Sequence, residues 1–219
     1  MSVALRAIFV LACVGVLSAP ALAQDFPRGR NAAALVRTRG APARRWSAII
    51  VHHSASSRGD AASIDAYHRN VRHFSRGMAY HFLIGNGHGL GDGEIEVGPR
   101  WTHQQPGAHV ASALRDPRAR DAWDNIAIGI CLVGDLDDSP PTPRQRATLA
   151  ELVSILRRRF GIEGERVLGH GGVPGAHTAC PGRRLSLTPL RTPLERGPAP
   201  GRARPTGGRG GRVPSRGRG

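Results

Sequence analysis

The segment NIAIGICLVGD, residues 125–135, limits the fold of this chain more than any other stretch. It is apolar at consecutive positions, so both faces of the strand that it predicts have to be covered. A strand of this kind belongs in the middle of a sheet that carries helices on each side. The rest of the sequence must therefore supply neighbouring strands and covering helices.

Four other short segments have the apolar and β-branched composition of strands. They are WSAIIVHHSA at 46–55, AYHFLIG at 79–85, EIEVG at 94–98 and ERVLGH at 165–170. Helical patterns alternate with these strands along the chain. This order predicts one α/β domain with a central mixed β-sheet flanked by helices.

The clearest helix follows the central strand. Thr142 is expected to cap it, Pro143 occupies the first turn, Gln145 completes a capping box and Gly161 ends it. Its apolar face consists of Leu149, Leu152, Val153, Leu156 and Phe160.

Two further helices are expected. One covers residues 61–74, with Asp60 as its N-cap, and a short one over 183–191 closes the domain. The apolar residues at helical spacing in the first of these are Ile64, Tyr67, Val71 and Phe74. Residues 99–125 are expected to form a long loop with some helix, and long loops in compact domains tend to be functional.

Residues 1–23 have the pattern of a secretory signal peptide. They contain one Arg, an apolar run and a final Ala-Leu-Ala before Gln24. A membrane anchor is the alternative, but the apolar run is short and is interrupted by Pro20. We expect an exported protein, periplasmic or secreted, with no transmembrane segment after cleavage.

The remaining boundaries follow from composition and charge. Residues 24–43 are expected to be an N-terminal linker, 44–193 the folded domain and 194–219 a disordered tail rich in Arg, Gly and Pro. The net charge is +15, and much of it comes from the tail, so the folded part is only mildly basic. Loose adhesion of the tail to anionic envelope polymers, or no specific partner at all, fits an exported chain better than binding to a specific nucleic acid. We expect a monomer.

The stretch GHGGVPGAHTACPG, residues 169–182, concentrates metal-binding side chains in one loop. His52 and His170 end two of the expected strands, and Cys180 follows in this loop. Three such ligands with an open fourth position are typical of a catalytic zinc site. The alternatives are buried, hydrogen-bonded histidines and a disulfide between Cys131 and Cys180, although Cys131 lies in the apolar central strand.

Five segments in order resemble the N-acetylmuramoyl-L-alanine amidase family, which includes peptidoglycan recognition proteins and bacteriophage T7 lysozyme. They are IIVHHSA, AYHFLIG, GAH, NIAIGICLVGD and GH…TACPG, and the resemblance covers about residues 46–190. It implies a mixed sheet with surrounding helices and a zinc ion in a surface cleft. It also implies hydrolysis of the amide between N-acetylmuramic acid and the L-alanine of the stem peptide.

The resemblance assigns the Zn²⁺ ligands to His52, His170 and Cys180. His53 should point away from the metal, because successive strand residues face opposite sides. The loop between His170 and Cys180 is longer than the common family form, and GHR is replaced by GHG. His177 in this loop is therefore a competing ligand, and we favour His170 because a strand end fixes its backbone.

The resemblance also assigns roles to Tyr80 and Thr178. Tyr80 is expected beside the zinc-bound water, and Thr178 as a hydrogen-bond donor to the oxyanion. Three residues are placed in the substrate-binding part of the site: His109, Trp101 and Asn125. His109 is expected to line the cleft, and Trp101 to pack against a sugar or stem peptide.

Hydrogen bonds from Asn125 and His81 are expected to hold the shape of the site. Glu96 matches an acidic family position with no assigned role. The general base is not identified.

The leading interpretation is a zinc amidase that cleaves peptidoglycan or its fragments. A peptidoglycan-binding protein without catalytic activity is the alternative. Family members that only bind lack the zinc cysteine, so Cys180 favours the enzyme.

Overall fold

The computed structural model describes residues 25–38, 40–110 and 113–194. The expected signal peptide and the tail from residue 195 onward lie outside these residues. Six strands form one sheet in the order β1-β4-β3-β5-β2-β6. They are β1 (Arg28–Gly29), β2 (Ala48–His53), β3 (Phe82–Ile84), β4 (Ile95–Val97), β5 (Ala127–Leu132) and β6 (Val167–Gly169).

The sheet is mixed, as predicted, and β5 lies inside it. β5 runs parallel to β2 and β3, and β2 also pairs in parallel with β6. β4 is antiparallel to both β3 and β1. Because β2, β5 and β6 are parallel, the residues that follow them meet at one end of the sheet, where the expected metal ligands lie.

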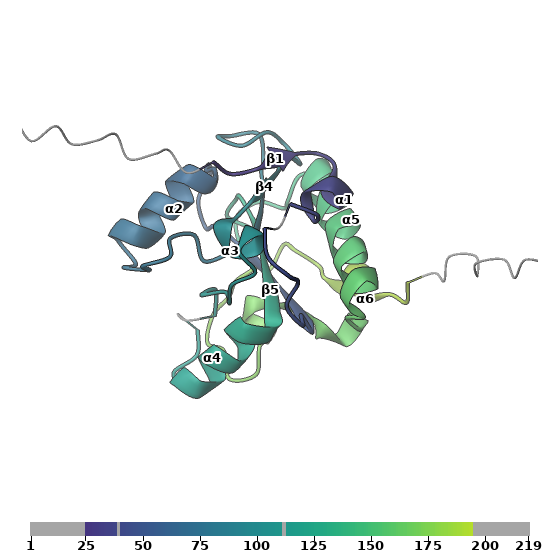
Figure 1. Cartoon of the computed structure of the whole chain (residues 1–219). Helices are drawn as coiled ribbons and strands as arrows, with labels where there is room; N and C mark the ends of the chain where they lie inside the picture. Colours follow the sequence, from purple (N-terminus) through teal and green to yellow (C-terminus); the bar gives the residue numbers. More distant parts are fainter. Residues whose placement is uncertain (1–24, 39, 111–112, 195–219) are drawn as a thin grey trace, which may run out of the picture.

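Six helices surround the sheet (Figure 1). They are α1 (Ala32–Leu35), α2 (Ala61–Asn70), α3 (Pro99–Thr102), α4 (Pro117–Ile126), α5 (Pro143–Phe160) and α6 (Thr188–Arg191). Two short 3₁₀ turns flank β6, η1 (Gly164–Arg166) and η2 (His170–Gly172). Helices α1, α5 and α6 lie on one side of the sheet, and α2 and α4 on the other (Figure 1).

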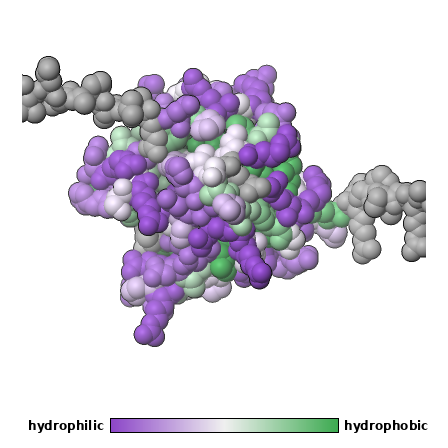
Figure 2. Space-filling model, viewed as in Figure 1, coloured by the Kyte–Doolittle hydropathy of each residue, from purple (hydrophilic) through white to green (hydrophobic). Residues whose placement is uncertain are grey.

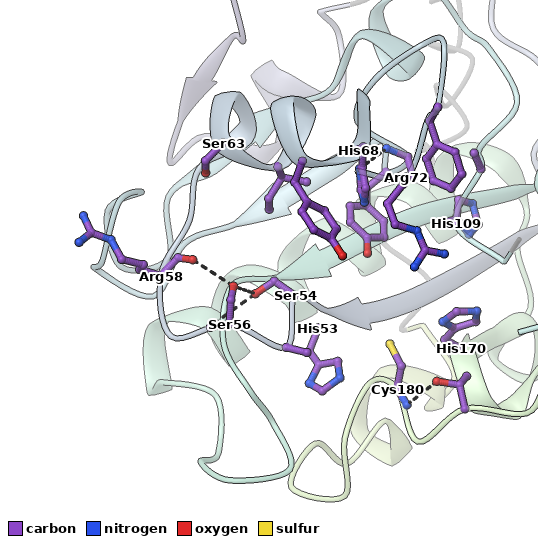
Figure 3. Close-up of a pocket in the computed structure, with 18 residues that line it drawn as sticks. His53, Ser54, Ser56, Arg58, Ser63, His68, Arg72, His109, His170 and Cys180 are labelled. Atoms are coloured by element: carbon purple, nitrogen blue, oxygen red, sulfur yellow. Dashed lines mark hydrogen bonds between the residues drawn. The ribbon is translucent and has the colours of Figure 1, made fainter. Parts of the chain in front are cut away.

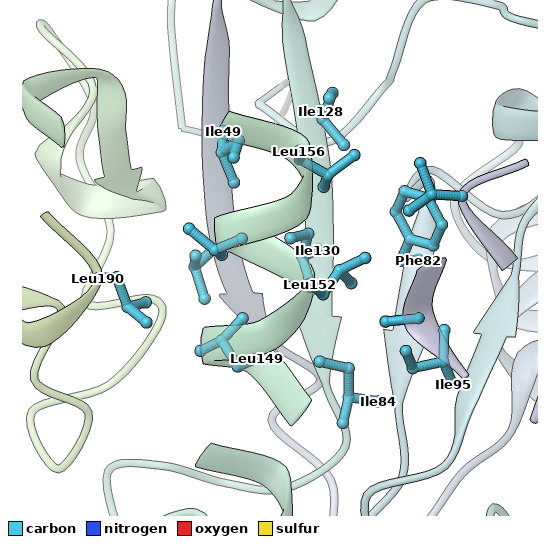
Figure 4. Packing of buried hydrophobic residues seen from close by; sticks show 14 of the residues in the cluster. Ile49, Phe82, Ile84, Ile95, Ile128, Ile130, Leu149, Leu152, Leu156 and Leu190 are labelled. Atoms are coloured by element: carbon cyan, nitrogen blue, oxygen red, sulfur yellow. The ribbon is translucent and has the colours of Figure 1, made fainter. Parts of the chain in front are cut away.

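Helix α5 begins and ends where the sequence predicted. The Thr142 side chain accepts a hydrogen bond from the Gln145 amide, and the Gln145 side chain accepts one from the Thr142 amide. Gly161 ends the helix with a φ of 65°, a left-handed conformation that favours glycine. The leucines of α5 pack on alternate residues of β2, β3 and β5 and form the largest apolar cluster (Figure 4).

The expected linker over residues 24–43 is wrong for residues 28–36. Arg28 and Gly29 pair with β4 at the edge of the sheet. Three residues of α1 and its cap, Ala32, Leu35 and Val36, are buried in the same cluster as α5. These residues are part of the fold because they cover apolar surface of the sheet and of α5.

Helix α2 leaves part of its apolar stripe exposed, although Ile64 packs against the cluster that contains Leu83 and Cys131. Tyr67 and Val71 are 51% and 57% exposed, whereas Asp65 and His68 are buried. The reason is hydrogen bonding. The Met78 amide donates to Asp65 Oδ1 at 2.7 Å, and the Ala79 amide donates to His68 Nδ1 at 3.1 Å. The polar side of α2 thus satisfies backbone groups of the segment that leads into β3.

The surface seen in Figure 2 is mostly hydrophilic, with smaller hydrophobic areas between the polar side chains. Within the part of the chain that the structure describes, every helix is too short or too polar to cross a bilayer.

Candidate active site

His52 comes from the middle of the sheet. It is the fifth residue of β2 and lies opposite Cys131 of β5 in the strand register. Ile49 and Val51 face the α5 cluster, so His52 projects toward the side of α2 and α4. Its side chain is buried, with the residue 1% exposed.

His170 and Cys180 reach the same point from the segment after β6. His170 begins η2, directly after Gly169, and is buried. The Gly171 amide donates to the Cys180 carbonyl at 2.6 Å, which holds the far end of the loop against its start. The Cys180 Sγ lies 3.7 Å from His52 Nδ1.

One ligand atom each from His52, His170 and Cys180 lie within 4.8 Å of one another. His177 is exposed, and its amide donates to the Ala113 carbonyl. His170, and not His177, therefore belongs to the group of possible ligands. His53 lies outside the group, and its Nδ1 accepts a hydrogen bond from the Leu136 amide at 3.0 Å.

Burial keeps all three side chains of this group uncharged. It lowers the pKa of His52 well below its usual range, and the neighbouring His170 and His109 lower it further. It also lowers the pKa of His170 to about 4 and raises that of the Cys180 thiol to about 12. Neutral imidazoles have lone pairs for a metal, and a bound metal ion would displace the thiol proton.

The residues fit a zinc ion. Two imidazoles and one thiolate are a donor set of catalytic zinc sites, which leave the fourth position open. Among the described residues, His170 Nε2 is buried with no hydrogen-bond partner. A buried nitrogen without a partner is costly, and a metal ion would satisfy it. Cys131 and Cys180 are both free thiols, so the disulfide alternative is not formed.

A cleft of about 650 Å³ opens over this group (Figure 3). Arg72 and His68 lie on its α2 side, and Cys180 and His170 on the opposite side. Tyr80, Thr178 and His109 also line it. Sequence reasoning missed three further residues of the cleft, which are Arg58, Arg72 and Tyr67. The chain contains many arginines, and nothing in the sequence distinguishes these two. Tyr67 has the spacing of a core-facing residue.

Tyr80 and Thr178 lie close to the three ligand residues. The Tyr80 ring centroid is 5.0 Å from that of His52. Burial raises the pKa of the Tyr80 phenol well above its usual range, so the hydroxyl keeps its proton and can donate a hydrogen bond. The Thr178 hydroxyl accepts from the Cys180 amide at 3.2 Å, which leaves its own proton available to donate.

Two predicted substrate-binding residues are placed elsewhere. Trp101 is wholly buried in the α5 cluster, where it packs against Phe82 with ring centroids 4.7 Å apart. Asn125 is exposed at the end of α4, where its side chain accepts from Arg44 and donates to the Asp121 carbonyl. Neither residue lines the cleft. Both predictions are corrected: Trp101 stabilises the core, and Asn125 fixes the end of α4.

His81 and Glu96 have structural roles. His81 Nδ1 accepts from the Gly129 amide at 2.9 Å, and its Nε2 lies 3.1 Å from the Gln105 carbonyl. This agrees with the prediction that His81 holds the shape of the site. Glu96 accepts a hydrogen bond from the Ala61 amide and so caps α2 from β4.

Residues 42–183 match the family described as N-acetylmuramoyl-L-alanine amidase. Among solved structures, the chain is similar to two proteins of Clostridium intestinale URNW. For the endolysin N-acetylmuramoyl-L-alanine amidase LysCS, the identity is 27%, the TM-score is 0.50, and the match covers 64% of this chain and 77% of that one. For the N-acetylmuramoyl-L-alanine amidase LysC, the identity is 25%, the TM-score is 0.52, and the coverages are 69% and 89%.

The Drosophila peptidoglycan recognition protein SD is also similar, at 19% identity and a TM-score of 0.49, with coverages of 67% and 83%. No curated protein sequence matches the chain.

Proposed function

Because this chain belongs to the N-acetylmuramoyl-L-alanine amidase family, we propose that it is a zinc hydrolase of peptidoglycan or its fragments. The bond cleaved is the amide between N-acetylmuramic acid and the L-alanine of the stem peptide. The observation that carries the proposal is the convergence of His52, His170 and Cys180 beside an open cleft. A protein that only binds peptidoglycan has no need of two buried histidines and a half-buried cysteine in ligand geometry, with an unpartnered His170 nitrogen.

His52, His170 and Cys180 would hold the zinc ion. When bound, zinc lowers the pKa of a water molecule and polarises a carbonyl. Tyr80 and Thr178 supply hydrogen-bond donors on the cleft side of these ligands, where the oxygen of the attacked amide gains negative charge. Both donors are neutral, so they stabilise the oxyanion through hydrogen bonds and not through a formal charge.

The cleft suits an anionic peptide with apolar parts. Arg72 extends its guanidinium group into the cleft, and stem peptides carry carboxylates that it can attract (Figure 3). The exposed Tyr67, with Ile64 and Phe74, forms an apolar wall on the α2 side. This wall takes the place that the sequence analysis gave to Trp101.

The protein is further proposed to act outside the cytoplasm, on the strength of the signal-peptide pattern in residues 1–23. Peptidoglycan is then reached directly after export. The basic residues 197–219 would add weak, salt-sensitive attraction to anionic envelope polymers.

The decisive experiment measures hydrolysis and binding side by side. Purified protein with zinc is incubated with intact sacculi and with soluble muropeptides, and mass spectrometry follows release of peptides with a free N-terminal alanine. Cys180→Ser should lose hydrolysis by orders of magnitude and keep much of its binding to sacculi, because the cleft is unchanged. Binding without release of peptides by the native protein would instead establish the non-catalytic alternative.

A further inference from the structure

We propose that His109 is a positioning residue that fixes the tautomer and the orientation of the metal ligand His52. The inference rests on the proposed zinc site, and it concerns a side chain behind that site. His109 was expected to line the substrate cleft. It does border the cleft, but its side chain has no exposed surface. Its ring therefore faces other protein groups.

The atoms around the two rings determine where the protons are. His109 Nε2 lies 3.2 Å from the Ala127 carbonyl oxygen, which can only accept, so Nε2 carries a proton. In a neutral ring, His109 Nδ1 is then an acceptor. It lies 3.3 Å from His52 Nε2, which must donate to it.

The consequence for His52 is a defined ligand atom. With its proton on Nε2, the lone pair is on Nδ1, and Nδ1 is the nitrogen that faces Cys180 Sγ at 3.7 Å. Metal-bound histidines are commonly held in this way by a partner on the second nitrogen. In this protein the partner is another histidine, and the chain of hydrogen bonds ends on the backbone of β5.

The position of His109 is itself fixed. Asp124 Oδ1 accepts from the amides of His109 and Val110, at 3.0 and 3.3 Å, and holds this part of the backbone. The ring lies against Gly129 of β5, where an added Cβ would be 2.6 Å from the ring carbon Cδ2. Gly107 leaves similar room, since a Cβ there would be 2.2 Å from the same carbon. The two glycines thus provide the space that the imidazole ring occupies.

Two substitutions separate positioning from packing. His109→Leu fills the space but offers no acceptor to His52, whereas His109→Asn places an acceptor near the position of Nδ1. If His109 positions His52, zinc binding measured by chelator competition should weaken about 10- to 100-fold in His109→Leu. His109→Asn should retain most of the affinity. Urea unfolding of both metal-free variants shows that they fold.

Tighter zinc binding by His109→Leu than by His109→Asn would overturn the inference. If His109 only packs, the apolar Leu is tolerated better than the buried Asn, and His109→Leu binds zinc as tightly as the native protein. Equal losses in the two variants would also contradict a positioning role.

Nitrogen-15 NMR of the histidine rings in the metal-free native protein provides a second test. It should show the His52 proton on Nε2 and a bare Nδ1. The reverse tautomer at His52 refutes the positioning role, whatever the zinc affinity. This measurement separates the inference from the proposed function, because a native protein that binds no zinc defeats the proposed function while the tautomer remains measurable.

Discussion

The two faces of the central sheet bury different kinds of side chain. On the side of α5, β2 and β5 present Ile49, Val51, Ile128 and Ile130, and the leucines of α5 cover them (Figure 4). On the other side the same two strands present His52 and Gly129, with buried histidines above them. The first face holds the largest apolar cluster, whereas the second combines two smaller apolar clusters with buried, hydrogen-bonded histidines. We therefore expect mutations on the first face to affect stability and those on the second to affect the site.

The largest effect is expected from a metal ligand. His170→Ala should lose zinc and reduce hydrolysis by orders of magnitude, because two protein ligands remain. His177→Ala, in the same loop, should keep its zinc, since this side chain is exposed and outside the ligand group. Metal content and amidase rate of the two variants test this directly. Loss of zinc from His177→Ala alone would reverse the assignment.

A substitution that leaves a cavity on the α5 side of the sheet should reduce stability and leave the metal site intact. Leu152 is completely buried, and Leu152→Ala is expected to lower the free energy of unfolding by about 2–5 kcal/mol. The zinc affinity of the folded protein should be unchanged, because Leu152 packs in the cluster on the opposite face of the sheet from His52. Urea unfolding and chelator competition measure the two quantities. A folded Leu152→Ala variant with weakened zinc binding would show that the two faces are coupled.

Some parts of the fold could be predicted from the sequence, and others could not. The ends of α5 and the central position of β5 were predictable, because caps and continuous apolar runs are local signals. The structural role of residues 28–36 was not, since a two-residue strand and a single helical turn leave no periodicity. Trp101 was misplaced because a sequence does not tell a buried tryptophan from one that lines a cleft.

In the site, too, features with a local sequence signal were predictable and features without one were not. His52, His170 and Cys180 could be proposed because metal-binding residue types lie near strand ends and because five segments in order resemble the amidase family. The orientation of α2 was only partly predictable, since Ile64 packs against the core while Tyr67, one turn further along, is exposed. The buried side of this helix instead uses Asp65 and His68 to satisfy amides 11 to 13 residues away. Such long-range hydrogen bonds have no local pattern.

A smaller effect on the rate is expected at Tyr80. Tyr80→Phe removes one donor from the site and should lower turnover by about 10²-fold, with zinc content unchanged. Tyr67→Phe is the matched comparison and should cause a much smaller loss, because Tyr67 is on the outer wall of the cleft. Steady-state kinetics on a soluble muropeptide separate the two. If the Tyr80→Phe rate is native-like, the oxyanion donor is another group.

Mildly acidic pH should lower the free energy of unfolding, because the side of the sheet that faces α2 and α4 contains buried histidines. Burial lowers the pKa of His68 and of His170 to about 4, below their ordinary value of 6.5. As pH falls from 6.5 toward 4, the unfolded chain binds protons that the folded protein does not, so the free energy of unfolding decreases. The pKa values of His52, His81 and His109 are lowered in the same direction by burial.

Glu96 opposes this trend, because burial raises its pKa, but it is one carboxyl against five histidines. Urea unfolding of the metal-free protein at pH 7.5 and pH 5.5 measures the difference. His68→Asn, which cannot be protonated, should reduce the pH dependence. Equal stability at the two pH values would show that these histidines are more accessible to protons than their burial indicates.

The pairing of β1 with β4 has a consequence for self-association. Without Arg28 and Gly29, β4 would be the outermost strand, with Ile95 and Val97 beside a row of unpaired backbone groups. An exposed apolar strand of this kind can pair with the same strand of another molecule and begin aggregation. β1 is only two residues long, so it covers this strand and offers little for a second chain to extend. Any shortened form of the protein intended for expression should therefore retain the residues from Arg28 onward.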